Sequence, residues 1–124
     1  PPPPPPRAPA ARARPAPRPG GAAGGGGGPA VAAIFCEPMA DGGVACGLPR
    51  ASAIQYAAQM MLGTAKMVLE TNQHPGALKD SVCSPAGSTI QGVRTLEERG
   101  RRAAVLDAVT VAYEKNVELK KASD

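Results

Sequence analysis

The sequence predicts an all-α domain of five helices in residues 29–124, preceded by a disordered tail in residues 1–28. Two observations predict the helices. Apolar residues recur at three- and four-residue spacing, which lines them up on one face of a helix. Proline and glycine interrupt this pattern at the positions expected for helix ends. The third observation is the composition of the first 28 residues, which cannot form a core.

The tail contains ten of the 15 prolines, seven of the 15 glycines and four arginines, with no apolar side chain larger than alanine. Such a segment cannot offset the entropy of folding by burying apolar surface. Its first part favours extended polyproline II, and its glycine-rich part favours flexible coil. The four tail arginines also account for the whole net charge of +4, because the other ten basic residues are balanced by ten acidic ones.

The first helix is expected from Pro29 to about Cys46. Its apolar side carries Val31, Ile34, Phe35 and Met39. Pro38 lies inside this segment, where a proline removes a backbone hydrogen bond and costs about 3 kcal/mol. We therefore expect that the helix either kinks at Pro38 or begins later.

The segment from Arg50 to about Asn72 has the clearest helical pattern. The residues that share one face are Ile54, Ala58, Met61, Leu62, Ala65 and Leu69. The methionines of this segment are interpreted as core packing rather than as a redox or metal site, because unbranched Met side chains readily fill apolar interiors. Asn72 to Pro75 is expected to end the helix.

Three further helices follow. Pro75 and Pro85 both suit the first turn of a helix, where the missing N–H has no partner anyway. They predict a short helix over Pro75–Val82 and a second one from about Ala86 to Arg99, with Gly100 as its stop. The last helix is expected from Arg101 to about Lys121. Five helices with wide apolar faces leave more hydrophobic surface than one chain can cover, so we expect a dimer.

The loop Cys83–Thr89 is the candidate functional segment. It places small residues and hydroxyl groups at a helix N-terminus, where free N–H groups and the helix dipole favour a small anion such as a carboxylate. An ordinary capped loop would have a similar composition. His74 is interpreted as a turn residue rather than a general acid, because no partner that would orient its ring is visible.

A longer run of residues around this loop resembles the C-terminal signature of pyrroline-5-carboxylate reductases, the last enzymes of proline biosynthesis. The run comprises Leu78, Lys79, Asp80, Val82, Ser84, Pro85, Gly87, Thr89, Ile90, Leu96 and Glu97. Upstream, Ala40–Val44, Gly47–Pro49 and Leu62–Met67 also match, and downstream Arg102–Ala104 and Asp107–Val109 match. The resemblance covers roughly residues 29–121.

The resemblance implies an all-α dimerisation domain of the 6-phosphogluconate dehydrogenase C-terminal type, which forms a homodimer or a larger oligomer. It implies that Ser84 and the backbone amides around Ala86 and Gly87 bind the carboxylate of a small imino acid, and that Val82 lines the pocket. Thr89 is the implied catalytic residue, with its hydroxyl near the ring nitrogen and the nicotinamide. Two positions depart from the family: Ala86 replaces a usual glycine and Asn72 a frequent glutamate.

The family reduces 1-pyrroline-5-carboxylate to L-proline with NADPH or NADH, which it holds on an N-terminal Rossmann domain. That domain requires G-x-G-x-x-G between a strand and a helix. No start within residues 20–28 places glycine at all three positions, and no apolar strand precedes them. Two hypotheses follow: a fragment of the reductase, or a non-catalytic oligomerisation module that pairs with full-length subunits. Because the chain begins with proline rather than methionine, we expect a fragment or a processed product.

Other functional classes are disfavoured. Four dispersed tail arginines and three aromatic residues in the chain are too few for a nucleic-acid surface. No stretch has the eighteen or so apolar residues that span a bilayer. The three cysteines are scattered, which argues against disulfides and against a zinc site. The compartment stays open between cytoplasm and mitochondrion, since the arginine-containing tail lacks the serine of a transit peptide.

Overall fold

The computed structural model describes residues 27–123, which form five helices and contain no strand. The helices are α1 (Gly28–Ala45), α2 (Arg50–Thr71), α3 (Pro75–Ser81), α4 (Ser88–Glu98) and α5 (Arg101–Ser123). This confirms the all-α, five-helix prediction. The predicted disordered tail, residues 1–28, lies outside the described residues except for its last two positions.

Helix α1 runs through Pro38 without interruption. The alternative in which the helix begins later is therefore wrong. Pro29 lies in its first turn, as predicted, and the N–H of Val31 closes that turn on the carbonyl of Gly27 at 3.1 Å. Pro38 withholds only one N–H from the helix, and the remaining bonds and the packing against α2 hold the helix together.

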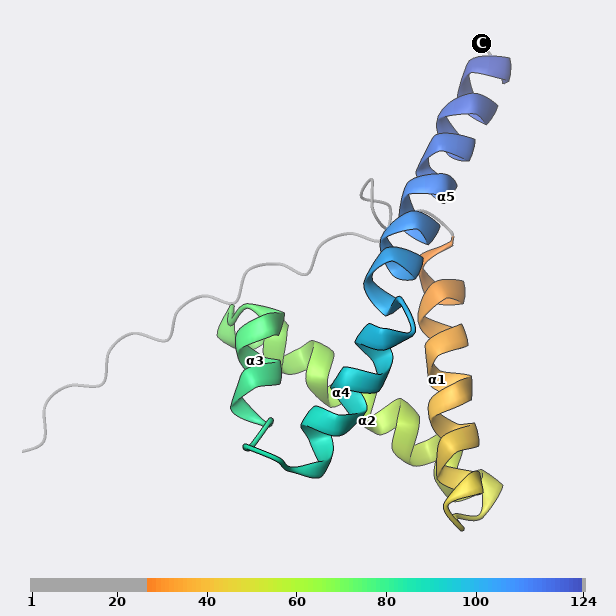
Figure 1. The fold of residues 1–124 in the computed structure, drawn as a ribbon. Coiled ribbons are helices and arrows are strands. Elements are labelled where there is room, and N and C mark those ends of the chain that lie inside the picture. The colour runs from red at the N-terminus through yellow and green to blue at the C-terminus, as the bar shows by residue number, and fades with distance from the viewer. Residues whose placement is uncertain (1–26, 124) are drawn as a thin grey trace, which may run out of the picture.

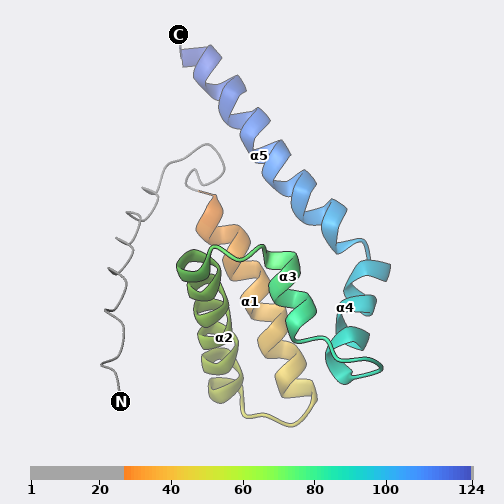
Figure 2. The ribbon, with the colours of Figure 1, turned by 90° about the vertical axis from the view of Figure 1, so that its left-hand side faces the viewer.

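Helices α1 and α2 form an antiparallel hairpin, which is visible in two views (Figures 1 and 2). The connection between them is tight: the N–H of Leu48 donates to the carbonyl of Gly43 at 3.0 Å. Gly47 has a φ of +108°, a conformation that residues with a side chain rarely adopt. Arg50 and Asp41 form an exposed ion pair of 2.6 Å across the two helices.

Small residues make up the contact between α1 and α2. The buried side chains are Ala40, Ala53 and Ala57, with Cys36 and Val44 packed beside them. Gly43 faces α2 so closely that a Cβ added to it would lie 3.3 Å from the Cβ of Ala53. The two backbones can approach this closely because neither helix places a large side chain between them.

The large apolar residues predicted on α1 and α2 do not lie in the contact between these two helices. Leu62 is 62% exposed and Leu69 64% exposed, and the methionines of α2 are not buried within the chain. Within this chain, α2 contacts α1 through Ala53 and Ala57, which lie outside the predicted apolar stripe. The larger apolar residues remain free because the smaller ones already form the contact.

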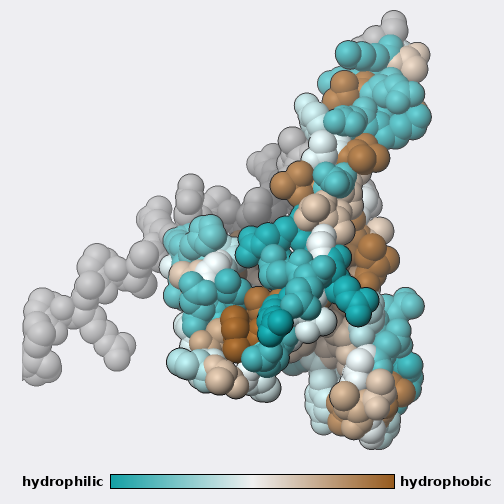
Figure 3. All heavy atoms as spheres, viewed as in Figure 1, coloured by the Kyte–Doolittle hydropathy of each residue, from teal (hydrophilic) through white to brown (hydrophobic). Residues whose placement is uncertain are grey.

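The other three helices have little to pack against within one chain. Helix α4 contacts α5 near their junction, and α5 projects from the rest as an arm (Figures 1 and 2). Its exposed apolar residues are Leu106, Val109, Val111, Tyr113 and Leu119. Hydrophobic residues reach the surface along this arm and between α3 and α4 (Figure 3). A surface of this kind requires a partner.

The junction of α4 and α5 is stabilised by one carboxylate. Gly100 has a φ of +76° and ends α4, as predicted. Glu97 then accepts hydrogen bonds from Arg101 and from Nε of Arg102, the latter at 2.9 Å to Oε2. The bond from Arg101, followed by that from Arg102, holds the pKa of Glu97 below its ordinary value.

The α1–α2 contact predicts different outcomes for two neighbouring glycines. Gly42→Ala should raise the free energy of unfolding by about 1 kcal/mol, because alanine favours the helix and nothing lies within 4 Å of the added Cβ. Gly43→Ala gains the same propensity but must fit against Ala53 and Leu48, so it should stabilise less. Chemical denaturation of both variants at one protein concentration measures this. Equal stabilisation would contradict the proposed close approach.

The lowered pKa of Glu97 predicts acid sensitivity. A carboxyl whose folded pKa is below its unfolded value adds stability at neutral pH, and this stability is lost as the pH falls through the folded pKa. Glu97→Gln should therefore lower the melting temperature at about pH 7 and have little effect at about pH 3. Thermal unfolding across this range measures it. The control is Glu98→Gln, which removes a carboxylate paired with Arg94 inside α4 alone; a Glu97→Gln deficit independent of pH would refute the account.

Candidate functional site

The candidate site is the loop between α3 and α4. Helix α3 closes with 3.2 Å bonds from the N–H of Val82 to the carbonyl of Lys79 and from Cys83 to Asp80. The chain then turns and enters α4 at Ser88 (Figures 1 and 2). The predicted order of helix, tight loop and helix is confirmed.

The loop contains a four-residue turn, Ser84–Pro85–Ala86–Gly87. The N–H of Gly87 donates to the carbonyl of Ser84 at 3.1 Å, and Ala86 has a φ of +57°. Proline second and a positive φ third are features of a type II turn. Pro85 therefore begins a turn rather than a helix, and the predicted helix start at Ala86 is wrong by two residues. The positive φ of Ala86 prevents the helix from starting there.

The same turn explains two of the predicted site residues. A positive φ favours glycine, so the alanine at position 86 holds a strained backbone conformation. Gly87 allows a close approach: a Cβ added there would overlap the Oγ of Ser84. The absence of a side chain at position 87 thus leaves room for the Ser84 hydroxyl.

The first turn of α4 presents free hydrogen-bonding groups. Among the described residues, the N–H groups of Ser88, Thr89 and Ile90 have no acceptor, and Gly87 supplies no side-chain cap. The hydroxyl of Thr95, further along the helix, donates to the carbonyl of Gln91 at 3.0 Å. Thr89 has no helical turn before it and makes no such bond within residues 27–123. This end of α4 therefore offers donors and a positive dipole to an anion.

The structure places all the predicted site residues in one short segment. Ser84, Ala86 and Thr89 are exposed, as is Val82 at the end of α3, whereas Gly87 is half-buried. The amide of Gly87 is already used within the turn. A carboxylate at this loop would therefore find its free amides at Ala86, Ser88 and Thr89. The exposed loop has the form of one wall of a site.

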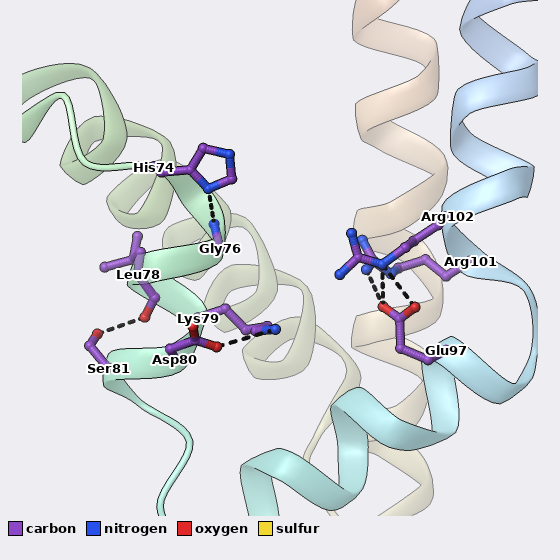
Figure 4. Close-up of polar contacts among 9 residues, drawn as sticks. All are labelled: His74, Gly76, Leu78, Lys79, Asp80, Ser81, Glu97, Arg101 and Arg102. Carbon is purple, nitrogen blue, oxygen red and sulfur yellow. Dashed lines mark hydrogen bonds and ion pairs between the residues drawn. The ribbon is translucent and has the colours of Figure 1, made fainter.

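Two polar residues before α3 act as a helix end and a helix cap; the end of α2 at Asn72 was predicted, and the cap by His74 was not. Asn72 ends α2 with a φ of 54°, a left-handed conformation that asparagine tolerates better than most residues. His74 caps α3: its Nδ1 accepts from the N–H of Gly76 at 2.9 Å (Figure 4). The histidine before a proline was the available signal, but histidine is not among the preferred caps.

Within residues 27–123, no three His, Cys, Asp or Glu side chains gather in a way that could bind a metal ion. None of the helices described has the length and apolar composition needed to cross a membrane.

Known proteins share this arrangement. The family described as "Pyrroline-5-carboxylate reductase dimerisation" matches residues 21–119. The pyrroline-5-carboxylate reductase of Escherichia coli K12 is 58% identical over 93 residues, covering 75% of this chain and 35% of that enzyme. The enzyme of Methanosarcina acetivorans is 59% identical over 85 residues, which cover 68% of this chain and 32% of that enzyme. Human pyrroline-5-carboxylate reductase 2 is 48% identical over 96 residues, which cover 77% of this chain and 30% of that enzyme.

Solved structures of pyrroline-5-carboxylate reductases also superimpose on this chain. A pyrroline-5-carboxylate reductase from Coxiella burnetii superimposes with a TM-score of 0.74 at 34% identity, covering 79% of this chain and 36% of that one. The Plasmodium falciparum enzyme, solved with NADP bound, superimposes with a TM-score of 0.71 at 36% identity. The match covers 76% of this chain and 36% of that one. The chain thus spans about a third of the length of the relatives it matches. It belongs to the pyrroline-5-carboxylate reductase family and corresponds to that family's dimerisation domain.

Proposed function

We propose that this chain forms the dimerisation and substrate-binding part of a reductase that converts 1-pyrroline-5-carboxylate to L-proline with NADPH or NADH. The observation that carries the proposal is the exposed start of α4, where unpaired amides adjoin the Ser84 and Thr89 hydroxyls. The substrate has a carboxylate beside a ring C=N group. A site for it needs anion donors next to a hydroxyl that can reach the ring nitrogen.

Each loop residue has a distinct role in the proposed site. The Ser84 hydroxyl and the amides of Ser88 and Thr89 donate to the substrate carboxylate, and the dipole of α4 adds to this attraction. Thr89 directs its hydroxyl to the ring nitrogen and so orients the C=N bond. Val82 packs against the ring carbons. These contacts fix the angle at which the imine carbon faces an incoming hydride.

The dinucleotide supplies the hydride when it is bound, but residues 27–123 do not fit it. They contain no strand, so they cannot form the strand, glycine-rich loop and helix that bind a pyrophosphate. The contribution of this segment is therefore positioning of the substrate and assembly of the dimer. No step of hydride transfer is assigned to its residues.

The exposed apolar faces of α2 and α5 support assembly through helices, first as a homodimer. They also support the second hypothesis, a non-catalytic module that pairs with full-length subunits. In that case the module would lend Ser84 and Thr89 to a partner that holds the nucleotide. The two hypotheses differ in whether this chain supports turnover without such a partner.

A complementation assay tests the function. The chain is mixed with a full-length relative, such as the Escherichia coli enzyme, in which valine replaces the residue matching Thr89. NADPH oxidation with pyrroline-5-carboxylate should recover on mixing. Thr89→Val in this chain should lower the recovered rate by about 100-fold, whereas Thr89→Ser should retain most of it.

The outcomes separate the hypotheses. Turnover by this chain alone would contradict the module. Formation of mixed dimers, shown by native mass spectrometry, without any recovered turnover would contradict the proposed role of Thr89. Failure to form mixed dimers would refute the proposed pairing with full-length subunits.

The loop backbone predicts a second set of outcomes. Ala86→Gly should raise the free energy of unfolding by about 1 kcal/mol, because glycine adopts a positive φ without strain. Gly87→Ala should weaken L-proline binding as much as Ser84→Ala does, since the added methyl displaces the Ser84 hydroxyl. The double variant should lose no more than either single one. Amide NMR shifts during proline titration measure this, and additive losses would contradict it.

A further inference from the structure

A cavity separate from the loop lies between the start of α3 and the junction of α4 and α5. Its volume is about 350 Å³, and its walls include His74, Lys79, Val93, Leu96, Arg101 and Arg102. None of the residues from Val82 to Thr89 lines it. Cavities that bind small molecules begin at about this size.

Basic side chains line this cavity from two sides. Lys79 extends from α3 toward the junction, and Arg102 extends back from α5 (Figure 4). Glu97 is shared between two arginines, so it neutralises only one of their two charges. Asp80 lies 3.3 Å from Lys79 and pairs with it at the surface, so the three basic and two acidic side chains leave a net charge of +1. The cavity therefore keeps a surplus of positive charge.

The arginines also have donors to spare. Arg102 contacts Glu97 through Nε alone, at 2.9 and 3.1 Å. Its two terminal NH₂ groups have no acceptor within residues 27–123. A guanidinium presents such donors in a planar fork that matches two oxygens of a phosphate.

We propose that this cavity binds a small molecule carrying a phosphate monoester. Arg102, with Arg101 and Lys79, binds the phosphate, and Val93 and Leu96 contact the apolar part of the molecule. A phosphate monoester carries close to two negative charges at neutral pH and is attracted by the net positive charge and the unpaired donors of Arg102. The site shares no residue with the proposed imino-acid loop, so either proposal can fail without the other.

An NMR titration at constant ionic strength tests the site. Phenyl phosphate should shift the amide signals of Gly76 and Arg102 and leave those of Ser84 to Thr89 in place. Arg102→Gln and Lys79→Gln should each weaken binding by about tenfold. The matched control is Arg94→Gln: Arg94 also pairs with a carboxylate, Glu98 at 2.9 Å, but lies outside the cavity. It should bind as the unaltered chain does.

Glu97→Gln distinguishes binding from a structural effect. It releases the arginine donors, so phenyl phosphate should bind more tightly even though the junction is weakened; weaker binding would overturn the proposal. So would an equal loss in Arg94→Gln, or shifts confined to the Ser84–Thr89 loop. Inorganic phosphate serves as the second probe, and binding as tight as that of phenyl phosphate would overturn the monoester assignment. If a second copy of the chain fills the cavity, no shift occurs and the proposal fails.

Discussion

The contact between α1 and α2 is made by small residues, and this leaves the large apolar side chains of the chain exposed to solvent. Ala40, Ala53 and Ala57 are the buried side chains, and Gly43 meets Ala53 directly. Alanine and glycine permit close backbones but bury little apolar area each, so this hairpin gains modest hydrophobic stabilisation. The larger apolar residues of α2 and α5 stay outside it. A domain built this way leaves apolar surface that a partner chain can cover, which agrees with its membership of a dimerisation family.

The exposure of the loop follows from the same arrangement. Helices α3 and α4 do not rest on a large internal core, so the turn between them is held by local bonds. The Ser84 carbonyl, the positive φ of Ala86 and the space beside Gly87 define it. Such a loop can present hydroxyls and amides outward to a ligand.

Much of the fold could be predicted from the sequence because proline and glycine act locally. Gly100 and Pro75 mark a helix end and a helix start as expected. The helix start predicted from Pro85 was wrong, because the positive φ of Ala86 makes this proline part of a turn. The face of α2 that contacts α1 was not predicted. Periodicity finds an apolar stripe but does not tell whether its partner lies in the same chain or in another copy.

The loop and the basic cavity lie at opposite ends of the same two helices. His74, just before α3, and Lys79, within it, line the cavity together with Leu96 near the end of α4, whereas Val82 and Thr89 flank the loop. An anion held between Lys79 and Arg102 would oppose separation of α3 from the α4–α5 junction. A ligand shifts a conformational equilibrium only by its differential affinity for the two states. Binding at the cavity would thus affect the loop only to the extent that the distance between these helices changes when the imino acid binds.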